Sequence, residues 1–464
     1  MREGRSAFWP DYRTIWRWHM LAGLFCLPFV AFLALTGAIY LFKPQVDDLI
    51  DWRYDHLAVT GAPAAPSAEV RAALEAVPGS RFMAYELPRP GHGAARIIVL
   101  RGGEAIRVYV DPSSLAILKQ VPEEARFERL VFKLHGQLLL GNVGSVIVEM
   151  VASWTIVLIL TGLYLWWPRG RSGLAGILYP RLGLAGRARW RDLHAVSGVW
   201  LSLVLALFLV SGLPWSFVWG HALQSVEQRV GRLMAVQDWE IGAVPVRDTI
   251  AGHRVAAHAG MGGMGGMGGM GGMGGMPGME MGGGQAVAPD GLVGLDDVVA
   301  TGVRLGLPAP VLVTPPAAAG AAWQVRSDTQ DRPLRASVQV APDGAVMSRQ
   351  DFAGKGLVDR AVGYGVAAHE GQLFGWPNQL LNLLVASGLA TMSIAATILW
   401  LRRRPPGGWG VPAALPGRRV GVGAVTVMVL LGVLLPELGI SLLLLAAAAW
   451  VMGRRVRADG TETV

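Results

Sequence analysis

Four long runs of apolar residues constrain this chain more than any other feature of its sequence. Residues 20–42, 150–167, 195–219 and 380–401 contain no charged side chain. Each run approaches the roughly 20 residues with which a helix crosses about 30 Å of hydrocarbon. The chain is 52% hydrophobic and only 16% charged, which excludes an ordinary soluble protein. We expect a helical membrane protein whose first run is a retained anchor and not a cleaved signal peptide.

The C-terminal tail carries two further apolar runs that are shorter. Residues 420–435 and 438–452 are separated by Pro436-Glu437, and arginines flank their outer ends. This pattern favours a hairpin of two short helices over a single span. We therefore expect six membrane segments, four in a core and two in this hairpin.

The placement of arginine indicates how the chain is oriented. Residues 168–191 include six arginines and no acidic residue, and further arginines precede the first run and follow the fourth. Because basic loops stay in the cytoplasm, we expect these parts and the N-terminus inside the cell. The long segments 43–140 and 220–378 are then outside. The net charge of +8 reflects this topology and gives no ground for binding nucleic acid.

Two of the nine histidines begin matching patterns in the two halves of the chain. His19 is followed by Thr36-Gly37, and His194 is followed at the same spacing by Ser211-Gly212. A duplication with histidines at the edges of paired spans suggests ligands for a cofactor held inside a helix bundle. The small residues would let a helix or a flat ring approach closely.

A second pair of histidines matches equally well. His135-Gly136-Gln137-Leu138 resembles His369 with its following Glu370-Gly371-Gln372-Leu373. His135 precedes the end of its apolar run by too many residues for one straight helix. Breaks at Gly141-Asn142-Val143-Gly144 and Gly375-Trp376-Pro377 indicate short interfacial helices that carry these histidines. This arrangement puts His19 and His194 near the inner face, and His135 and His369 near the outer face.

Paired imidazoles suit one class of cofactor in particular. A planar metal macrocycle held without covalent bonds needs two axial imidazoles from opposite sides and apolar walls around it. The chain has no C-x-x-C-H motif and only one cysteine, Cys26, which excludes covalent haem attachment and an internal disulfide. The alternative is that duplication has preserved histidines that only pack. Glu149, at the outer start of the second run, is expected at the interface, with proton relay as its alternative role.

The external segments also repeat a common plan. Short helices are predicted over residues 68–77 and 295–305, and strands over 96–100, 106–110 and 336–340. Turns follow at Asp111-Pro112 and at Pro342-Asp343-Gly344. We therefore expect two small α+β modules outside the membrane. Nothing along the chain resembles a phosphate loop, a dinucleotide fingerprint or a hydrolase triad.

A methionine- and glycine-rich insert at 253–284 stands apart from this plan. Thioether sulfur is a soft ligand for Cu(I), and glycine would let several sulfurs converge on one ion. The alternative is a low-complexity linker in which methionine is incidental. The candidate ligands for a soft metal are His253, His258, Met261, Met264, Met267, Met270, Met273 and Met276.

The first 404 residues resemble the PepSY-associated transmembrane family, which includes iron-regulated membrane proteins and ferric-siderophore reductases. The resemblance lies in Trp18-His19, Leu134-His135-Gly136, Asp192-Leu193-His194, Val108-Tyr109-Val110-Asp111-Pro112 and His369-Glu370-Gly371-Gln372-Leu373. It implies paired b-type haems in a bacterial inner membrane and reduction of a metal or metal chelate on the periplasmic side. By this match, the axial-ligand candidates are His19, His135, His194 and His369. The external modules would then be PepSY-like and periplasmic.

These expectations give one main functional hypothesis and one alternative. The main one is a reductase with two non-covalent haems b that takes electrons from quinol or a cytoplasmic flavoprotein and reduces a ferric siderophore or cupric ion. The alternative is a non-enzymatic membrane protein that binds copper or peptides. Under both hypotheses the protein is embedded in lipid.

The expected organisation is an N-terminal span (1–42), a first module (43–126), an interfacial helix with the second span (127–167), a basic loop (168–191), a third span (192–219), a second module (220–365), an interfacial helix with the fourth span (366–404) and a C-terminal hairpin (405–464).

Overall fold

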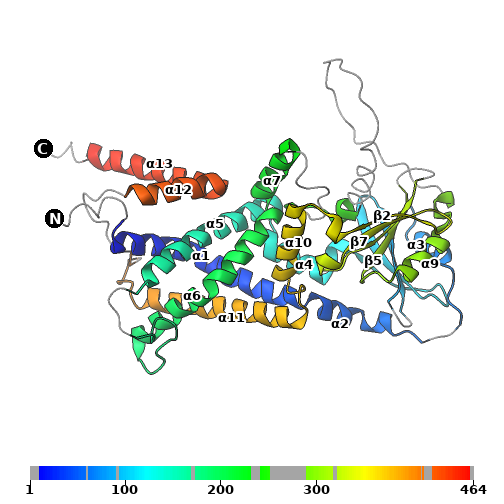
Figure 1. The fold of residues 1–464 in the computed structure, drawn as a ribbon, viewed down its shortest axis with the longest axis horizontal. Coiled ribbons are helices and arrows are strands. Elements are labelled where there is room, and N and C mark those ends of the chain that lie inside the picture. The colour runs from blue at the N-terminus through cyan, green and yellow to red at the C-terminus, as the bar shows by residue number, and fades with distance from the viewer. Residues whose placement is uncertain are drawn as a thin grey trace, which may run out of the picture.

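The structure is a computed structural model that describes residues 10–58, 61–89, 93–168, 173–230, 241–250, 289–316, 321–408, 410–411 and 421–459. A helical bundle forms one end of the molecule, and a β-sheet forms the other (Figure 1). Both termini lie at the end of the bundle that is remote from the sheet.

Four helices form the bundle, and within the described residues these four are long and apolar enough to cross a membrane. This confirms the four predicted spans. Helix α1 contacts both α5 and α11, and α6 contacts the same two helices. Their shared core includes Ala34, Leu205, Val385 and Leu389. The four helices are α1 (Tyr12–Leu41), α5 (Gly141–Trp166), α6 (Gly186–Gly212) and α11 (Trp376–Leu401).

The C-terminal tail forms the expected hairpin, although its helices are not both membrane-length. Helix α12 (Val422–Leu434) and helix α13 (Pro436–Asp459) pack against each other, and α13 also contacts α5. Helix α12 has 13 residues, which at about 1.5 Å per residue is well short of a bilayer core. The expectation of six membrane segments therefore becomes four helices of spanning length and a shorter hairpin.

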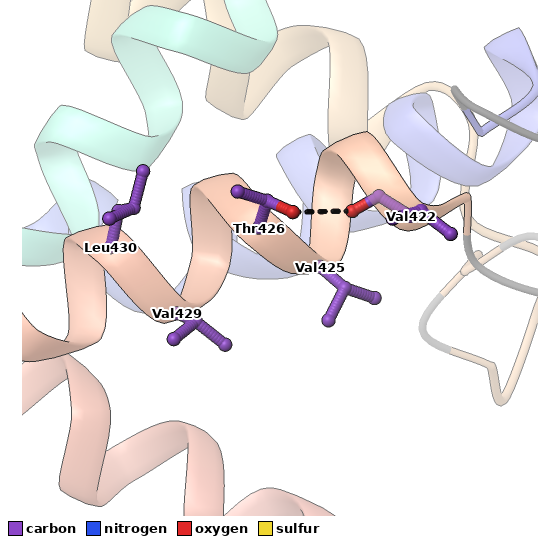
Figure 2. A pocket seen from close by; sticks show the side chains of 5 residues that line it. All are labelled: Val422, Val425, Thr426, Val429 and Leu430. Carbon is purple, nitrogen blue, oxygen red and sulfur yellow. Dashed lines mark hydrogen bonds between the residues drawn. The ribbon is translucent and has the colours of Figure 1, made fainter.

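The outer surface of α12 is apolar. Val425 and Val429 point to one side of α12 and Leu430 to the other, and with Val422 and Thr426 they line a shallow groove (Figure 2). The Thr426 hydroxyl donates a hydrogen bond to the Val422 carbonyl at 3.0 Å, so its polar group is satisfied within the helix. A surface of this composition is suited to contact with lipid chains.

Two short helices carry the second pair of histidines, as the length argument predicted. They are α4 (Phe127–Gln137) and α10 (Leu357–His369), and each ends before the next spanning helix begins. The first break lies slightly earlier than expected, because Leu138 and Leu139 have positive φ angles and α5 already begins at Gly141. Residues 142–144 are therefore helical.

Each half of the chain contributes one α+β module, as expected, and the two modules join in one continuous sheet. The strand order is β4-β3-β2-β1-β5-β6-β7-β8, with every neighbouring pair antiparallel. Strands β1 and β5 join the halves through Tyr85 opposite Val313 and Glu86 opposite Leu312. Pairing these two strands leaves neither half with an open inner edge. The strands are β1 (Arg81–Glu86), β2 (Ala95–Arg101), β3 (Glu104–Val110), β4 (Ile117–Pro122), β5 (Val311–Thr314), β6 (Trp323–Ser327), β7 (Ala336–Val340) and β8 (Val346–Asp351).

One face of this sheet is covered by a matching pair of helices. Helices α3 (Pro66–Ala76) and α9 (Leu295–Leu305) pack on it, and their buried Val70 and Val298 belong to the same core as Trp323. Sequence patterning predicted both helices and strands β2, β3 and β7. The outermost strands lead directly into the histidine helices: β4 is followed by α4, and β8 is followed by α10.

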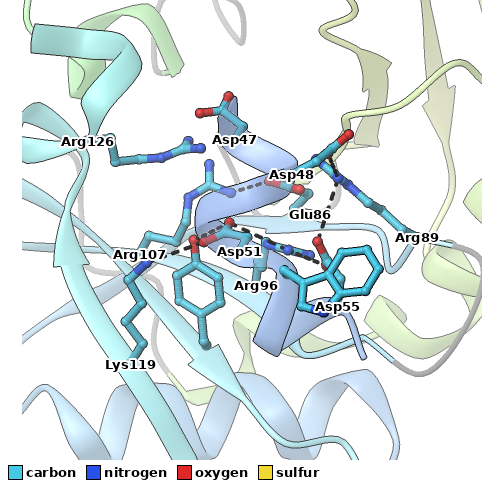
Figure 3. Close-up of polar contacts among 12 residues, drawn as sticks. Asp47, Asp48, Asp51, Asp55, Glu86, Arg89, Arg96, Arg107, Lys119 and Arg126 are labelled. Carbon is cyan, nitrogen blue, oxygen red and sulfur yellow. Dashed lines mark hydrogen bonds and ion pairs between the residues drawn. The ribbon is translucent and has the colours of Figure 1, made fainter. Parts of the chain in front are cut away.

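Helix α2 (Lys43–Asp55) continues from α1 and attaches the sheet to the bundle. Its aspartates face basic side chains of the sheet (Figure 3). Arg96 pairs with Asp55, and Lys119 pairs with Asp51 at 3.3 Å. Arg107 on β3 pairs with Glu86 on β1, across the intervening strand β2. Although burial of Glu86 opposes ionisation, Arg107 and then Arg96 lower its pKa to about 2.

Candidate functional site

His19 and His194 face each other from helices α1 and α6. Their ring centres are 6.2 Å apart and their planes make an angle of 78°. The hydroxyl of Thr161 donates to the Val157 carbonyl at 2.7 Å, so its oxygen accepts from Nδ1 of His19 at 2.9 Å. This hydrogen bond places the proton of His19 on Nδ1 and leaves the lone pair of Nε2 for a ligand.

His135 and His369 form a second pair with nearly the same geometry. Their ring centres are 6.3 Å apart and their planes make an angle of 84°. Nδ1 of His135 donates to the Thr36 hydroxyl at 3.1 Å, and Nδ1 of His369 donates to the Ser211 hydroxyl at 3.0 Å. Both hydroxyls donate to carbonyl groups of their own helices. Nε2 is therefore the nitrogen left for a ligand in this pair too.

A glycine follows each of these three hydroxyl residues and lies against the histidine ring. A β-carbon at Gly37 would lie 3.1 Å from Cε1 of His135, and one at Gly162 would lie 3.2 Å from Cε1 of His19. At Gly212 the corresponding distance to Cε1 of His369 is 3.8 Å. The hydroxyl and the glycine together set the position of the imidazole, one by a hydrogen bond and the other by leaving room.

His194 departs from this pattern. Its Nδ1 lies 3.4 Å from the carbonyl oxygen of Met392, with no hydroxyl in between. Counting from the matching histidines of the two halves, the position equivalent to Thr161 is Ala395, which is fully buried. The site between His19 and His194 is therefore asymmetric in its hydrogen bonding.

The histidines of α4 and α10 lie outside the spanning helices and are held as neutral bases. Burial lowers the pKa of His135 to about 4. Burial, followed by the nearby ring of His135, lowers the pKa of His369 to about 4. Both imidazoles are therefore unprotonated near pH 7, as metal ligation requires.

Amide side chains of α11 fix the end of α10 at His369. Asn382 donates from Nδ2 to the carbonyls of Ala368 at 2.8 Å and His369 at 3.0 Å. Asn378 also donates to Ala368, at 3.0 Å. These bonds satisfy carbonyl groups that a helix end would otherwise leave without partners.

A charge cluster fixes α6 at Asp192, two residues before His194. The buried Asp192 carboxylate accepts from Arg181 Nε at 2.7 Å and from Arg191 Nη2 at 2.9 Å. Arg181 belongs to the basic segment that we used to predict topology. This ion pair ties that segment to the helix and fixes the backbone beside the ligand candidate.

Both histidine pairs have the spacing that one shared metal ion requires. Two imidazoles that bind an ion from opposite sides, each through a bond of about 2.0 Å, have ring centres about 6 Å apart. The observed separations of 6.2 and 6.3 Å match this value. All four histidines are partly buried. The residues present therefore fit two sites of the bis-imidazole type.

The candidate soft-metal ligands in the insert lie outside the described residues. These are His253, His258 and the methionines from Met261 to Met276. Elsewhere, in the described ranges, no three His, Cys, Asp or Glu side chains gather in a group that could hold a metal ion.

Two residues with defined roles in this geometry were not identified from the sequence. Thr161 could have been found, because Thr161-Gly162 repeats the hydroxyl–glycine pattern of Thr36-Gly37 and Ser211-Gly212. Glu437 is the other residue. The sequence feature that could have revealed it is an acidic residue between two apolar runs. Glu149, expected at the membrane interface, is buried within the protein.

Comparison with known proteins places most of the chain in one family. Residues 16–403 match the family described as the PepSY-associated TM region. A search among curated proteins gave no match. The matched region contains both histidine pairs, all four spanning helices and the whole sheet, and it ends before the C-terminal hairpin. The chain belongs to the PepSY-associated transmembrane family.

Proposed function

We propose that this protein is an oxidoreductase of the bacterial inner membrane that holds two haems b without covalent bonds. His19 and His194 would bind one, and His135 and His369 the other. Haem iron supplies one-electron redox chemistry when bound. The observation that carries this proposal is the separation of 6.2 and 6.3 Å between ring centres in the two pairs.

The surrounding residues support ligation over simple packing of histidines. A packing histidine has no need for a defined tautomer, yet Thr161, Thr36 and Ser211 each accept a hydrogen bond from Nδ1. Such partners orient metal-binding imidazoles and raise their basicity. The same arrangement occurs in both halves of the chain and at both ends of the bundle, which chance packing does not explain.

The positions of the two pairs suit transfer of electrons across a membrane. His19 lies near the start of α1, at the end of the bundle remote from the sheet, while His135 contacts Thr36 near the other end of α1. We place the first end and the N-terminus in the cytoplasm, following the arginine distribution. The electron donor there is quinol or a cytoplasmic flavoprotein.

The substrate side of the proposal is the sheet. We assign it to the periplasm and to docking of a metal or metal chelate, with a ferric siderophore or a cupric ion as substrate. Reduction weakens the hold of hard oxygen ligands on iron, so it releases the metal from its chelate. The edge strands β4 and β8 are followed in the chain by α4 and α10, which carry His135 and His369. Short segments therefore connect the sheet, where the substrate would dock, to the outer pair of histidines.

The alternative is a non-enzymatic membrane protein that binds copper through the methionine-rich insert or peptides through the sheet. The exposed edge strand β8 favours the second variant, because an extended peptide can add to an open edge. Purified protein distinguishes these functions. Our proposal predicts a red preparation with reduced-minus-oxidised b-type bands, whereas the alternative predicts a colourless one that keeps copper only while residues 253–281 are present.

Activity is tested with the purified protein in sealed vesicles. A reductant is enclosed on the side of the termini, and a ferric chelate with a ferrous-specific dye is added on the side of the sheet. We expect dye colour to develop with intact protein and to fall at least 10-fold with His369→Ala, while His56→Ala, at an exposed helix end, keeps the full rate. Colour that develops equally with His369→Ala would overturn the proposal.

A further inference from the structure

The C-terminal hairpin brings a second carboxyl group against Glu149. Glu149 lies in α5 and Glu437 lies at the start of α13, and the two carboxyl groups are within hydrogen-bonding reach of each other. Their residues are only 2% and 7% exposed. Apart from this contact, neither oxygen of Glu437 has a hydrogen-bond partner in the described structure. Glu437 therefore depends on Glu149 for a polar contact.

The oxygens of Glu149 have further partners that favour a negative charge. Oε2 accepts from the backbone N–H of Val218 at 3.0 Å, and Oε1 accepts from that of Trp219 at 2.7 Å. These N–H groups belong to the first turn of α7 (Phe217–Val230), where the helix dipole favours an anion. Ser145 adds a hydroxyl that accepts from Phe217 at 3.2 Å. Glu149 therefore acts as a cap that α5 supplies to α7.

Glu437 has the opposite surroundings. Leu435 and Leu438 are buried beside it, in an apolar cluster with Leu213. Among the described residues of α5, α7, α12 and α13 around the pair, the only other ionisable side chain within about two turns is His221, which is exposed. Among these described residues, no lysine or arginine is present to balance two negative charges. Two ionised carboxylates in such a low-dielectric site would repel each other strongly.

We propose that Glu149 and Glu437 form a proton-binding site that holds one exchangeable proton between them. Within this pair the shared proton lets one carboxyl group donate a hydrogen bond to the other, ionised one. The bond fastens the hairpin to the bundle at a point where the indole N–H groups of Trp154 and Trp219 also reach it, donating to Ser441 and to the Leu434 carbonyl. The site lies in part outside the region that matches the family, because α13 follows residue 403.

Infrared spectroscopy of the full-length protein in lipid nanodiscs at pH 8 tests this proposal. We expect Glu437→Gln to remove one protonated-carboxyl band from the wild-type spectrum. Glu149→Gln should remove the same band, because the pair holds the proton and neither carboxyl group holds it alone. Glu75→Gln, at an exposed position of α3, is the matched control and should leave the band unchanged.

Thermal unfolding gives a second readout that does not depend on band assignment. Loss of the shared proton at alkaline pH should separate the carboxylates, so the Tm of the wild type should fall by about 3 °C or more relative to Glu437→Gln. The Gln amide can still donate to Glu149, so this variant should fold and keep its Tm. The proposal is overturned if Glu437→Gln leaves every carboxyl band in place, removes only half of the intensity of one band, or fails to fold.

Discussion

Nδ1 of His135 donates a hydrogen bond to the hydroxyl of Thr36 at 3.1 Å, which joins α4 to the end of α1. His369 and Ser211 repeat this bond at 3.0 Å between α10 and α6. The two halves of the chain thus present their imidazoles to each other in a fixed tautomer and at a fixed distance. This relationship connects the duplication in the sequence with the chemistry that we propose.

Replacing one histidine of a pair should remove one cofactor and leave the other. We expect His19→Ala to lower the porphyrin content of the purified protein from about two to about one per chain, because a single imidazole binds haem iron more weakly than two. His135→Ala should do the same but leave a haem with a different reduction potential. Pyridine haemochrome assay and redox titration measure both quantities. Loss of neither haem, or of both in each variant, would argue against two separate sites.

The hydroxyl of Thr161 should matter for one haem only. In Thr161→Ala, Nδ1 of His19 loses its acceptor, and we expect haem in that pair to dissociate roughly 10 to 100 times faster. The potential of the pair on α4 and α10 should not change. Ala395→Ser is the matched gain-of-contact variant, because it places a hydroxyl at the equivalent position near His194. Transfer of haem to apomyoglobin gives the rates, and equal rates for Thr161→Ala and wild type would contradict the assigned role.

Space at Gly37 should be needed for His135 to keep its position. A β-carbon there would approach Cε1 to 3.1 Å, so Gly37→Val is expected to displace the ring and remove the haem bound by His135 and His369. Gly136→Ala is the control, since Gly136 is next to His135 but has no atom within 4 Å of a β-carbon. Optical spectra of the two purified variants provide the comparison. A Gly37→Val protein with both haems intact would show that the close contact is not required.

The junction between bundle and sheet should be sensitive to pH through Glu128 on α4. Burial first, and Asp47 in addition, raise its pKa to about 7 against the attraction of Arg126 and Lys43. The pKa of Glu128 is raised in the folded state, so protonated Glu128 contributes fully to the stability of the fold below about pH 4.5. This contribution is lost as the pH rises through about 7.

Glu128→Gln tests this dependence directly. The neutral amide avoids the cost of ionisation, so at pH 8 it should raise the free energy of unfolding by roughly 1–3 kcal/mol relative to wild type. At pH 4.5 the two proteins should differ little. Denaturant unfolding at both pH values measures the difference, and a gain of the same size at both would rule out this explanation.

Much of the fold followed from patterns that act locally. Apolar runs of membrane length predicted the four spans, and period-two alternation predicted strands such as Ala336–Val340. The joined sheet could not be predicted, because the pairing of Tyr85 with Val313 links segments more than 200 residues apart. The break before α5 was placed too late, because Leu138 and Leu139 adopt positive φ angles that leucine rarely takes.

The site shows the same division. Duplication identified the histidines and paired them correctly as His19 with His194 and His135 with His369, but it did not show which groups hold their Nδ1 atoms. The acceptor of His19 is Thr161, 142 residues later, and only folding brings them together. The pairing of Glu149 with Glu437 was likewise hidden, because it depends on how the C-terminal hairpin returns to α5.

The central claim is that each facing pair of imidazoles binds one haem iron. Its most direct test is the porphyrin content of the purified full-length protein, read with its low-temperature electron paramagnetic resonance spectrum. We predict about two haems b per chain, both low-spin and bis-histidine. A protein that contains no porphyrin after expression with ample haem supply, or one with only high-spin iron, would contradict this account.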